Sequence, residues 1–508
     1  MNAYGRSLKI DARMVPVAIV GLAVLIRCLV PIDANIDWLV SNCRRFLDGA
    51  RLYKDIVETN PPMAIFIYLP ATVVERLTGW PAEGVFTTML LVAATASAWI
   101  FHHLVREQLP DALTRHVLLA SVLFAVLVAP LSAFGEREHV ALVLLLPLYG
   151  VAVRRAGGQA VSWPLVVAVG ALAGLAPMIK PYFALGVAAP YLFVAIRRRN
   201  ILSLVAPEAL LAALLLGIYA LLVAHFIPAY AREVMPLLVD LYQPMRLPLS
   251  EVLISFKPIM WVLSAACLYA AIRRQILNPV TGVLVAASAG FLLAMIVQGR
   301  NWPYHAYPAV ALMLTAIPQA IIPALTSGDP KRRVPAIAAV VAALAHLSYF
   351  TGFGYGGGGV VVPIRAAVAH PTVMSISFDL TPGHPITTET HGSWVGTYSS
   401  RWITANANYL LQRTTDPVRQ AKLKAWMAYD RAVTNRDLAR RPDIVLVGLG
   451  PFNWPGWIDA EPETRRLMQA YVPLAEDTLT PAQRQRYEGV EAYIRKDLVK
   501  PSVKPSRP

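Results

Sequence analysis

The feature that most limits the fold is a series of apolar stretches separated by short basic clusters. A helix needs about 20 apolar residues to cross a bilayer, and many of these stretches approach that length. Of the 508 residues, 56% are hydrophobic and only 15% are charged. A soluble domain cannot bury so much apolar surface, so the sequence predicts a polytopic α-helical membrane protein.

Eleven stretches are expected to cross the membrane. They are residues 14–31, 84–105, 116–134, 139–153, 164–178, 182–196, 205–227, 257–272, 280–298, 304–325 and 334–352. The first follows three basic residues, as a signal sequence would, but it is long and lacks a small-x-small cleavage site. We therefore expect it to be an uncleaved first span.

The segment from Pro61 to Leu77 is apolar but contains three prolines, and its treatment decides the topology. If it does not cross, every basic cluster falls on the cytoplasmic side, as the positive-inside rule requires. These clusters are Arg6/Lys9/Arg13, Arg106/Arg115, Arg154/Arg155, Arg197–Arg199, Arg273/Arg274 and Lys331–Arg333. We therefore expect 61–77 to be an interfacial or re-entrant helix on the outer face, with the N-terminus cytoplasmic.

The composition changes after the last apolar stretch. The predicted organisation is a membrane domain at 1–352, a glycine-rich linker at 353–361 and a soluble periplasmic α/β domain at 362–508. Within that domain, Thr372–Phe378 and Asp443–Gly448 are predicted to be strands, and Gln420–Arg440 and Pro481–Asp497 helices. The tail Lys500–Pro508 has the composition of a disordered segment.

The formal charge of +15 does not indicate nucleic-acid binding, because the basic residues lie between apolar stretches rather than in a stripe with aromatics. The three cysteines, Cys28, Cys43 and Cys267, are scattered and suggest neither a disulfide framework nor a metal site.

A polar loop follows the first apolar stretch and carries Asp33 and Asp37. A carboxylate held there could act as a general base toward a membrane-bound substrate. Asp37 is favoured, because Trp38 and the pattern after it predict a short helix with Asp37 at its N-terminus. The alternative is that the acids mark a polar loop, or that Asp37 only caps that helix.

Further polar motifs interrupt the later apolar stretches. Glu136, Arg137, Glu138 and His139 begin one stretch at its outer end and could bind a sugar, a metal or a partner loop. The alternative is ordinary helix-start chemistry, which favours acids.

Lys180 lies between two apolar stretches, beside Tyr182, and could bind a phosphate on a lipid donor. The alternative is that Lys180 reaches toward the headgroups.

Arg300, Asn301, Tyr304 and His305 form the densest polar cluster late in the membrane part. Arginine suits bidentate phosphate binding, although aromatic residues at this place are also typical of the interfacial belt. Under the predicted topology, this cluster and the three preceding motifs lie on one face of the membrane.

The order of these motifs resembles that of the bacterial GT-C glycosyltransferases, in the branch of the aminoarabinose transferases, protein mannosyltransferases and rhizobial galacturonosyltransferases. The shared order is an apolar span, an acidic loop with Asp37, Gly49-x-x-Leu52-Tyr53, Pro61-Pro62, the acids at 136–138 and Lys180-Pro181-Tyr182.

The resemblance implies a polyprenyl-phosphate sugar donor used on the outer face. It also implies that Asp37 is the catalytic base and that Glu136 or Glu138 matches the second-loop acid. Two departures concern the sugar and acceptor: Asp37 precedes Trp38 where many relatives have Asp-Glu, and the second-loop acid is Glu instead of Asp.

The predicted function is therefore an integral glycosyltransferase of a bacterial inner membrane. It would move a sugar, with inversion, from a polyprenyl phosphate to a lipid, glycan or protein acceptor, with Tyr53 among the binding residues. No cofactor is indicated, although a divalent metal is compatible with the acids. The alternatives are a transporter or flippase, which would need charges at mid-membrane depth, and a non-catalytic envelope-assembly protein.

Overall fold

The computed structural model describes residues 14–272, 278–326, 329–348, 360–450, 452–474 and 490–499. Contacts divide the described chain into two compact units. The helical unit comprises residues 14–32, 73–222 and 246–348, and the mixed unit comprises 33–72, 223–245 and 360–499. The first polar loop thus packs with residues far along the chain. The predicted linker lies almost entirely outside the described residues.

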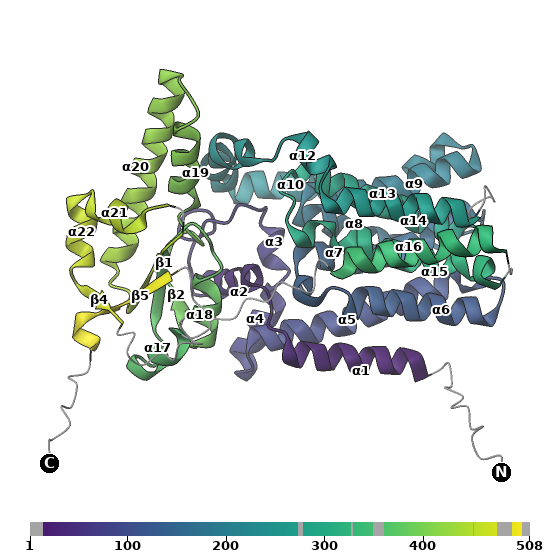
Figure 1. The fold of residues 1–508 in the computed structure, drawn as a ribbon, viewed down its shortest axis with the longest axis horizontal. Coiled ribbons are helices and arrows are strands. Elements are labelled where there is room, and N and C mark those ends of the chain that lie inside the picture. Colours follow the sequence, from purple (N-terminus) through teal and green to yellow (C-terminus); the bar gives the residue numbers. More distant parts are fainter. Residues whose placement is uncertain are drawn as a thin grey trace, which may run out of the picture. The chain divides into compact units, whose positions relative to one another are not determined.

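All eleven apolar stretches are helical over most of their described length (Figure 1). The helices are α1 (Met14–Leu29), α5 (Ala82–Val105), α6 (Ala112–Leu123), α7 (Arg137–Ala156), α8 (Trp163–Ile179), α9 (Ala184–Arg198), α10 (Pro207–Phe226), α13 (Phe256–Ile272), α14 (Pro279–Gln298), α15 (Pro303–Thr326) and α16 (Pro330–Ser348). A π-helical turn, η2 (Phe124–Val128), continues α6.

Among the described residues, four helices are long and apolar enough to cross a membrane. They are Ala82–Gln108, Arg137–Ala156, Pro207–Phe226 and Pro279–Gln298, and a fifth span results if α1 and the helix after it are counted together. The polytopic helical class is therefore confirmed, while the number of eleven crossings stays a prediction.

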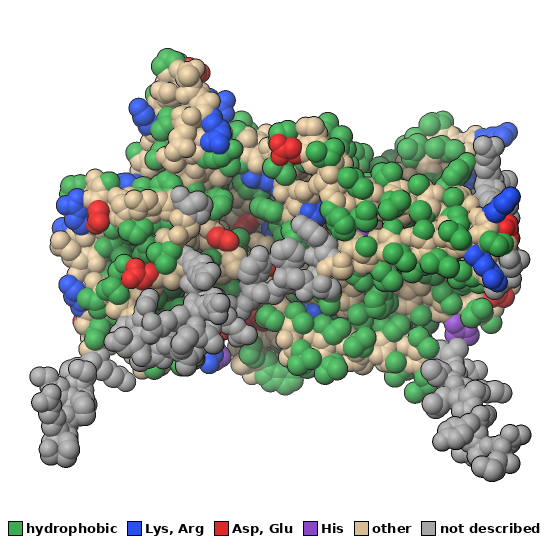
Figure 2. Space-filling view, viewed as in Figure 1, with side chains coloured by type: hydrophobic (Ala, Val, Ile, Leu, Met, Phe, Trp, Pro, Cys, Tyr) green, Lys and Arg blue, Asp and Glu red, His purple; other side chains and the backbone are tan. Residues whose placement is uncertain are grey.

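Apolar side chains face outward as well as inward in the helical unit. On α10, Leu214 and Leu221 are more than half exposed, and on α16 the same holds for Val341. Figure 2 shows hydrophobic side chains over most of the visible face of α13 to α16. Such a surface is unfavourable in water and suits a lipid environment.

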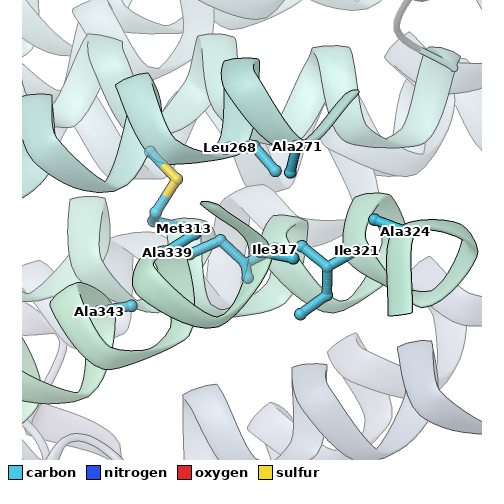
Figure 3. Close-up of a cluster of buried hydrophobic side chains, with 9 residues drawn as sticks. Leu268, Ala271, Met313, Ile317, Ile321, Ala324, Ala339 and Ala343 are labelled. Atoms are coloured by element: carbon cyan, nitrogen blue, oxygen red, sulfur yellow. The ribbon is translucent and has the colours of Figure 1, made fainter. Parts of the chain in front are cut away.

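Small residues bring three of the last four helices of this unit together. The buried cluster in Figure 3 joins α13, α15 and α16 through alanines, with Leu268, Met313, Ile317 and Ile321 filling the space between them. Small side chains at helix contacts allow backbones to approach closely, which is the usual way membrane helices associate.

The segment 61–77 forms two short helices, α3 (Met63–Phe66) and α4 (Leu69–Thr78). Ten residues of helix span about 15 Å, half of the hydrocarbon thickness of a bilayer. Neither helix is long enough to cross alone, in keeping with an interfacial or re-entrant segment.

The mixed unit contains a five-stranded sheet in the order β2-β1-β3-β5-β4. Its strands are β1 (Thr372–Ile376), β2 (Ser393–Trp394), β3 (Ile444–Gly448), β4 (Tyr471–Pro473) and β5 (Val490–Arg495). Strands β2, β1 and β3 are parallel, and β5 pairs antiparallel with β3 and β4. The two strands predicted from sequence, at 372–378 and 443–448, are confirmed.

The helices of the mixed unit are α2 (Ala34–Leu47), α3, the short α11 (Met235–Leu237), α17 (Val361–Ala367), α18 (Gly383–Glu389), α19 (Trp402–Leu411), α20 (Pro417–Ala439), α21 (Trp454–Asp459) and α22 (Pro462–Met468). Helix α20 confirms the helix predicted at 420–440.

The helix predicted at Pro481–Asp497 is wrong over its described part. Residues 490–495 form β5, and the side chains alternate between buried and half-buried positions with the period of two of a strand. Val490, Ala492 and Ile494 are the buried positions, and β5 pairs along its length with the buried strand β3.

A buried ionic network lies in the mixed unit beside the sheet. Arg401 contacts Asp430 at 3.3 Å and Asp437 at 3.2 Å, and all three side chains are fully buried. Burial raises the pKa of Asp430, although Arg401 and hydrogen bonds from Thr404 oppose that rise. Buried charges of this kind are tolerated only when each is paired.

Candidate active site

The two acids of the first polar loop have different surroundings. Asp33 is the N-cap of α2, where its carboxylate accepts a hydrogen bond from the Asn35 amide at 2.8 Å. Asp37 lies in the first turn of the same helix and is 5% exposed. The predicted helix after the first span is therefore confirmed, but Asp33, not Asp37, caps it. The alternative interpretation, in which Asp37 only caps the helix, therefore does not apply.

Glu58 joins this loop as an acid that the sequence analysis missed. The Trp38 indole nitrogen donates to Glu58 Oε2 at 2.5 Å, and the Asn60 amide donates to Oε1 at 3.0 Å. Glu58 is buried. The sequence offered one sign of this acid: Glu58 lies at the end of the first polar loop, two residues before Asn60-Pro61-Pro62.

Tyr53 is fully buried and adopts a left-handed backbone conformation, with φ of 64°. Its hydroxyl donates to the Asn60 carbonyl at 2.8 Å, and its ring packs on Tyr230 with centroids 4.9 Å apart. These contacts give Tyr53 a part in shaping the loop, which differs from the predicted role in binding substrate.

In the helical unit, the acidic motif opens α7. Glu136 and Arg137 are both buried and lie 3.4 Å apart as an ion pair. His139 accepts from the Gly135 amide at 3.0 Å through Nδ1 and donates to the Val126 carbonyl at 2.8 Å through Nε2. Both ring nitrogens are therefore engaged by backbone groups, so His139 fixes the turn before α7 and has no nitrogen left for a substrate.

Glu138 and Lys180 form the centre of the polar cluster in the helical unit. Lys180 Nζ lies 2.7 Å from Glu138 Oε1, and 3.5 Å from Gln298 Oε1. The Nε2 atom of His305 lies 3.6 Å from the same Glu138 oxygen. The ring of Tyr304 lies 5.5 Å from the Lys180 ammonium, within cation–π range.

This cluster arises because four helix ends meet, with Glu138 in the first turn of α7. Lys180 follows α8, Gln298 ends α14 and His305 lies in the first turn of α15. Glu138 is fully buried, and its Oε2 atom has no hydrogen-bond partner among the described residues. Because an unsatisfied buried carboxylate oxygen is costly, Glu138 is placed to bind a further donor.

The loop between α14 and α15 carries the remaining predicted residues. Lys257, which the sequence analysis missed, donates to the Asn301 carbonyl and, at 2.7 Å, to its side-chain oxygen. Asn301 therefore anchors the loop in a left-handed conformation, with φ of 52°. Arg300 lies beside it, its guanidinium 5.8 Å from the Trp302 ring. The sequence sign that would have identified Lys257 is that it is a single lysine at the start of the apolar stretch 257–272.

Tyr182 also lies near this loop. Its hydroxyl accepts a hydrogen bond from Arg246 at 2.8 Å, and Arg246 packs beside Gly299 at the end of α14. These segments of the helical unit therefore bring several cations together, namely Arg137, Lys180, Arg246, Lys257 and Arg300. Only Glu136 and Glu138, among the residues named here for this unit, oppose them, so this end suits an anionic ligand.

The structure thus groups Glu138, Lys180, Tyr304 and His305 directly, with Arg300 and Asn301 on the adjoining loop. Asp33, Asp37 and Tyr53 belong to the mixed unit. Within the described residues, no three His, Cys, Asp or Glu side chains are grouped as metal ligands.

Apolar helices that suit a membrane, a buried polar cluster where their ends meet and a following α/β module together define an integral membrane protein with a C-terminal domain. Comparison with solved structures places the fold. The chain is similar to ArnT from Cupriavidus metallidurans bound to undecaprenyl phosphate, with a TM-score of 0.53 and 12% sequence identity, over 96% of this chain and 98% of that chain.

The apo state of the same ArnT gives a TM-score of 0.52 at 12% identity, again over 96% of this chain and 98% of that one. An oligosaccharyltransferase from Archaeoglobus fulgidus, tethered with an acceptor peptide, gives 0.42 at 12% identity over 92% and 72% of the two chains. No protein-family model matches the sequence, and no curated protein matches it significantly.

The chain therefore has the fold of ArnT, membrane helices followed by a C-terminal domain, and the resemblance inferred from motif order is confirmed at the level of the fold.

Proposed function

We propose that this protein is a membrane glycosyltransferase that transfers a sugar from a polyprenyl phosphate to a lipid, glycan or protein acceptor. The observation that carries the proposal is the likeness in fold, over nearly the full length of both chains, to an ArnT that holds undecaprenyl phosphate. The cations of the helical unit, among them Lys180, Lys257 and Arg300, also support the proposal, because a phosphate leaving group requires cations.

In the proposed reaction, an acceptor hydroxyl oxygen attacks the anomeric carbon while Asp37 takes its proton. The bond from that carbon to the phosphate oxygen breaks, and polyprenyl phosphate departs with the electron pair. A single displacement of this kind inverts the anomeric centre. Asp37 suits the base because it is buried and does not cap its helix.

The departing phosphate would meet Lys180 and Arg300. Lys180 is held by Glu138 at 2.7 Å in this structure, so a phosphate would share the lysine with that carboxylate or displace it. His305, 3.6 Å from Glu138, is placed to satisfy the carboxylate when the lysine turns to the ligand. Glu138 is accordingly proposed to tune the cation site, which refines its predicted catalytic role.

The proposed location is a bacterial inner membrane, with the acids and cations on the periplasmic face. The two short helices at 61–77 support this orientation, because neither is long enough to cross alone. Reporter fusions test it: a reporter near Asp111 should be cytoplasmic and one near Glu136 periplasmic. The opposite result would mean that 61–77 crosses.

The activity is tested with purified protein in liposomes, supplied with a panel of undecaprenyl-phosphate-linked sugars and membrane acceptors. The readouts are release of free undecaprenyl phosphate and transfer of labelled sugar. Asp37→Asn should abolish both. Asp33→Asn is the matched control, because asparagine keeps the helix cap, and it should retain activity. Near-normal turnover by Asp37→Asn, or no turnover of any donor by the unaltered chain, would refute the proposal.

A further inference from the structure

The mixed unit joins the first polar loop to residues more than 300 positions later in the chain. Arg45, on α2, donates from one nitrogen to the Gly396 carbonyl at 2.6 Å and from another to the Asp55 carbonyl at 2.8 Å. One half-buried guanidinium therefore fixes both the loop and the C-terminal segment after β2. A charged donor bound to two carbonyls is a stronger link than a neutral hydrogen bond.

A second link runs through the backbone beside Glu58. The Val57 amide donates to the Thr397 carbonyl at 3.0 Å, and Val57 forms a parallel bridge with Tyr398. Thr397 is itself held by the buried Asp437, which accepts from its amide at 2.9 Å and from its hydroxyl at 2.8 Å. The ionic network that ends on Asp437 thus reaches the loop through a single threonine.

A third link is aromatic. The ring of His384, in α18, lies 5.0 Å from the ring of Trp38 and 4.4 Å from that of Trp394. Its Nε2 atom lies 3.2 Å from the Ser399 carbonyl, which assigns the proton to that nitrogen. Trp38 is the residue that binds Glu58, and it follows Asp37 directly.

Two of these links end on a residue next to an acid of the loop: Val57 precedes Glu58, and Trp38 follows Asp37. The third starts from Arg45, two helical turns beyond Asp37 on the same helix α2. An independent acceptor-binding module would have no need of buried bonds to this loop. Such bonds restrict the loop to one geometry.

We infer that the C-terminal α/β segments position the first-loop acids, with Thr397, Arg45 and His384 as positioning residues for Asp37 and Glu58. The inference rests on the proposed transfer reaction. Misplacing a reacting group by about 1 Å can cost about 100-fold in rate, so loosening the loop lowers kcat. On this inference the three residues act through the loop and not on the donor or acceptor, so KM for both substrates stays the same.

The test replaces Thr397 by valine, which keeps the shape and removes the hydroxyl, and by serine, which keeps the hydroxyl. Thr397→Val should lower kcat at least tenfold, with KM for donor and acceptor within twofold, and Thr397→Ser should restore most of the rate. The matched control is Thr381→Val, which removes a similar hydroxyl–carboxylate bond of 2.9 Å, to Asp379, from an exposed turn. The control should behave as the unaltered chain.

Hydrogen–deuterium exchange of peptides from 33–60 gives a readout independent of activity. Exchange there should rise in Thr397→Val and not in Thr381→Val. An unchanged kcat, a raised acceptor KM at constant kcat, or unchanged exchange would each overturn the inference. Failure of the unaltered chain to transfer any sugar would instead refute the proposed function, and the exchange data would still show whether Thr397 holds the loop.

Discussion

The buried histidine of the mixed unit makes the stability of this protein depend on pH in a calculable way. His384 is 1% exposed, between two tryptophans. Burial, with a smaller contribution from the charge of Arg45, lowers the pKa of His384 from 6.5 to about 3. The unfolded chain therefore binds a proton at this residue below pH 6.5, and the folded chain does not until about pH 3.

The sign follows from this difference in bound protons. Between pH 6.5 and 3 the unfolded state binds more protons, so the free energy of unfolding falls as the pH falls. Each unit of pH costs about 1.4 kcal/mol. Between pH 7 and pH 5, His384 should therefore remove about 2 kcal/mol of stability, beyond whatever the other groups contribute.

The measurement compares the unaltered chain with His384→Gln, which does not titrate. Guanidinium unfolding in detergent, followed by tryptophan fluorescence at pH 7, 6 and 5, gives the free energy of unfolding. The variant should lose about 2 kcal/mol less over this interval, whatever its stability at pH 7. The control is His391→Asn, an exposed histidine of the same unit in a left-handed conformation that asparagine accepts. Equal pH slopes for His384→Gln and the unaltered chain would refute the reasoning.

Three further substitutions test the packing and the buried charges. Lys180→Met leaves Glu138 buried without its cation and should lower the free energy of unfolding by about 3–5 kcal/mol, which thermal unfolding measures. Adding Glu138→Gln should recover part of the loss. A melting temperature equal to that of the unaltered chain would contradict the buried pair. Arg401→Met should destabilise the mixed unit by about 3–5 kcal/mol, since the buried Asp430 and Asp437 both lose their ion pair with Arg401. Unchanged guanidinium unfolding would exclude that network. Gly290→Ala should lower the melting temperature, because its Cβ would lie 2.4 Å from a backbone oxygen of α9. The control Gly217→Ala, with open space around it, should be neutral or stabilising by up to about 1 kcal/mol. If Gly217→Ala lowered the melting temperature more than Gly290→Ala, α9 and α14 would not pack this closely.

Local patterns sufficed for most of the helices and for the central strands. The apolar stretches became helices because backbone groups in an apolar setting must be satisfied within one segment. The run Asp443–Gly448 became the central strand β3 because its β-branched and apolar side chains are covered on both faces. The C-terminal stretch after 481 misled the prediction, because its alternation becomes visible only once β3 supplies the pairing partner.

The sequence predicted which residues form the candidate site better than it predicted what each of them contacts. Glu138, Lys180 and His305 were singled out separately, and the structure brings them together across 42 residues or more. Glu58 and Lys257 were missed, because a single charge in an otherwise ordinary segment carries no periodic signal. His139 was expected to bind substrate, yet two backbone groups that no local pattern reveals occupy its ring.

By itself, the sequence determined the class of this protein: a chain with too much apolar surface for water, basic clusters between its apolar stretches, and acids after the first of these stretches. Only the tertiary structure decided that Asp33 caps α2 and Asp37 does not, that Lys180 is paired with Glu138, and that residues 396–398 hold the first loop. The physical reason is the range of the interactions. Helix propensity and hydrophobicity act over a few residues, whereas ion pairs and buried hydrogen bonds join groups that only the folded chain brings within 3 Å.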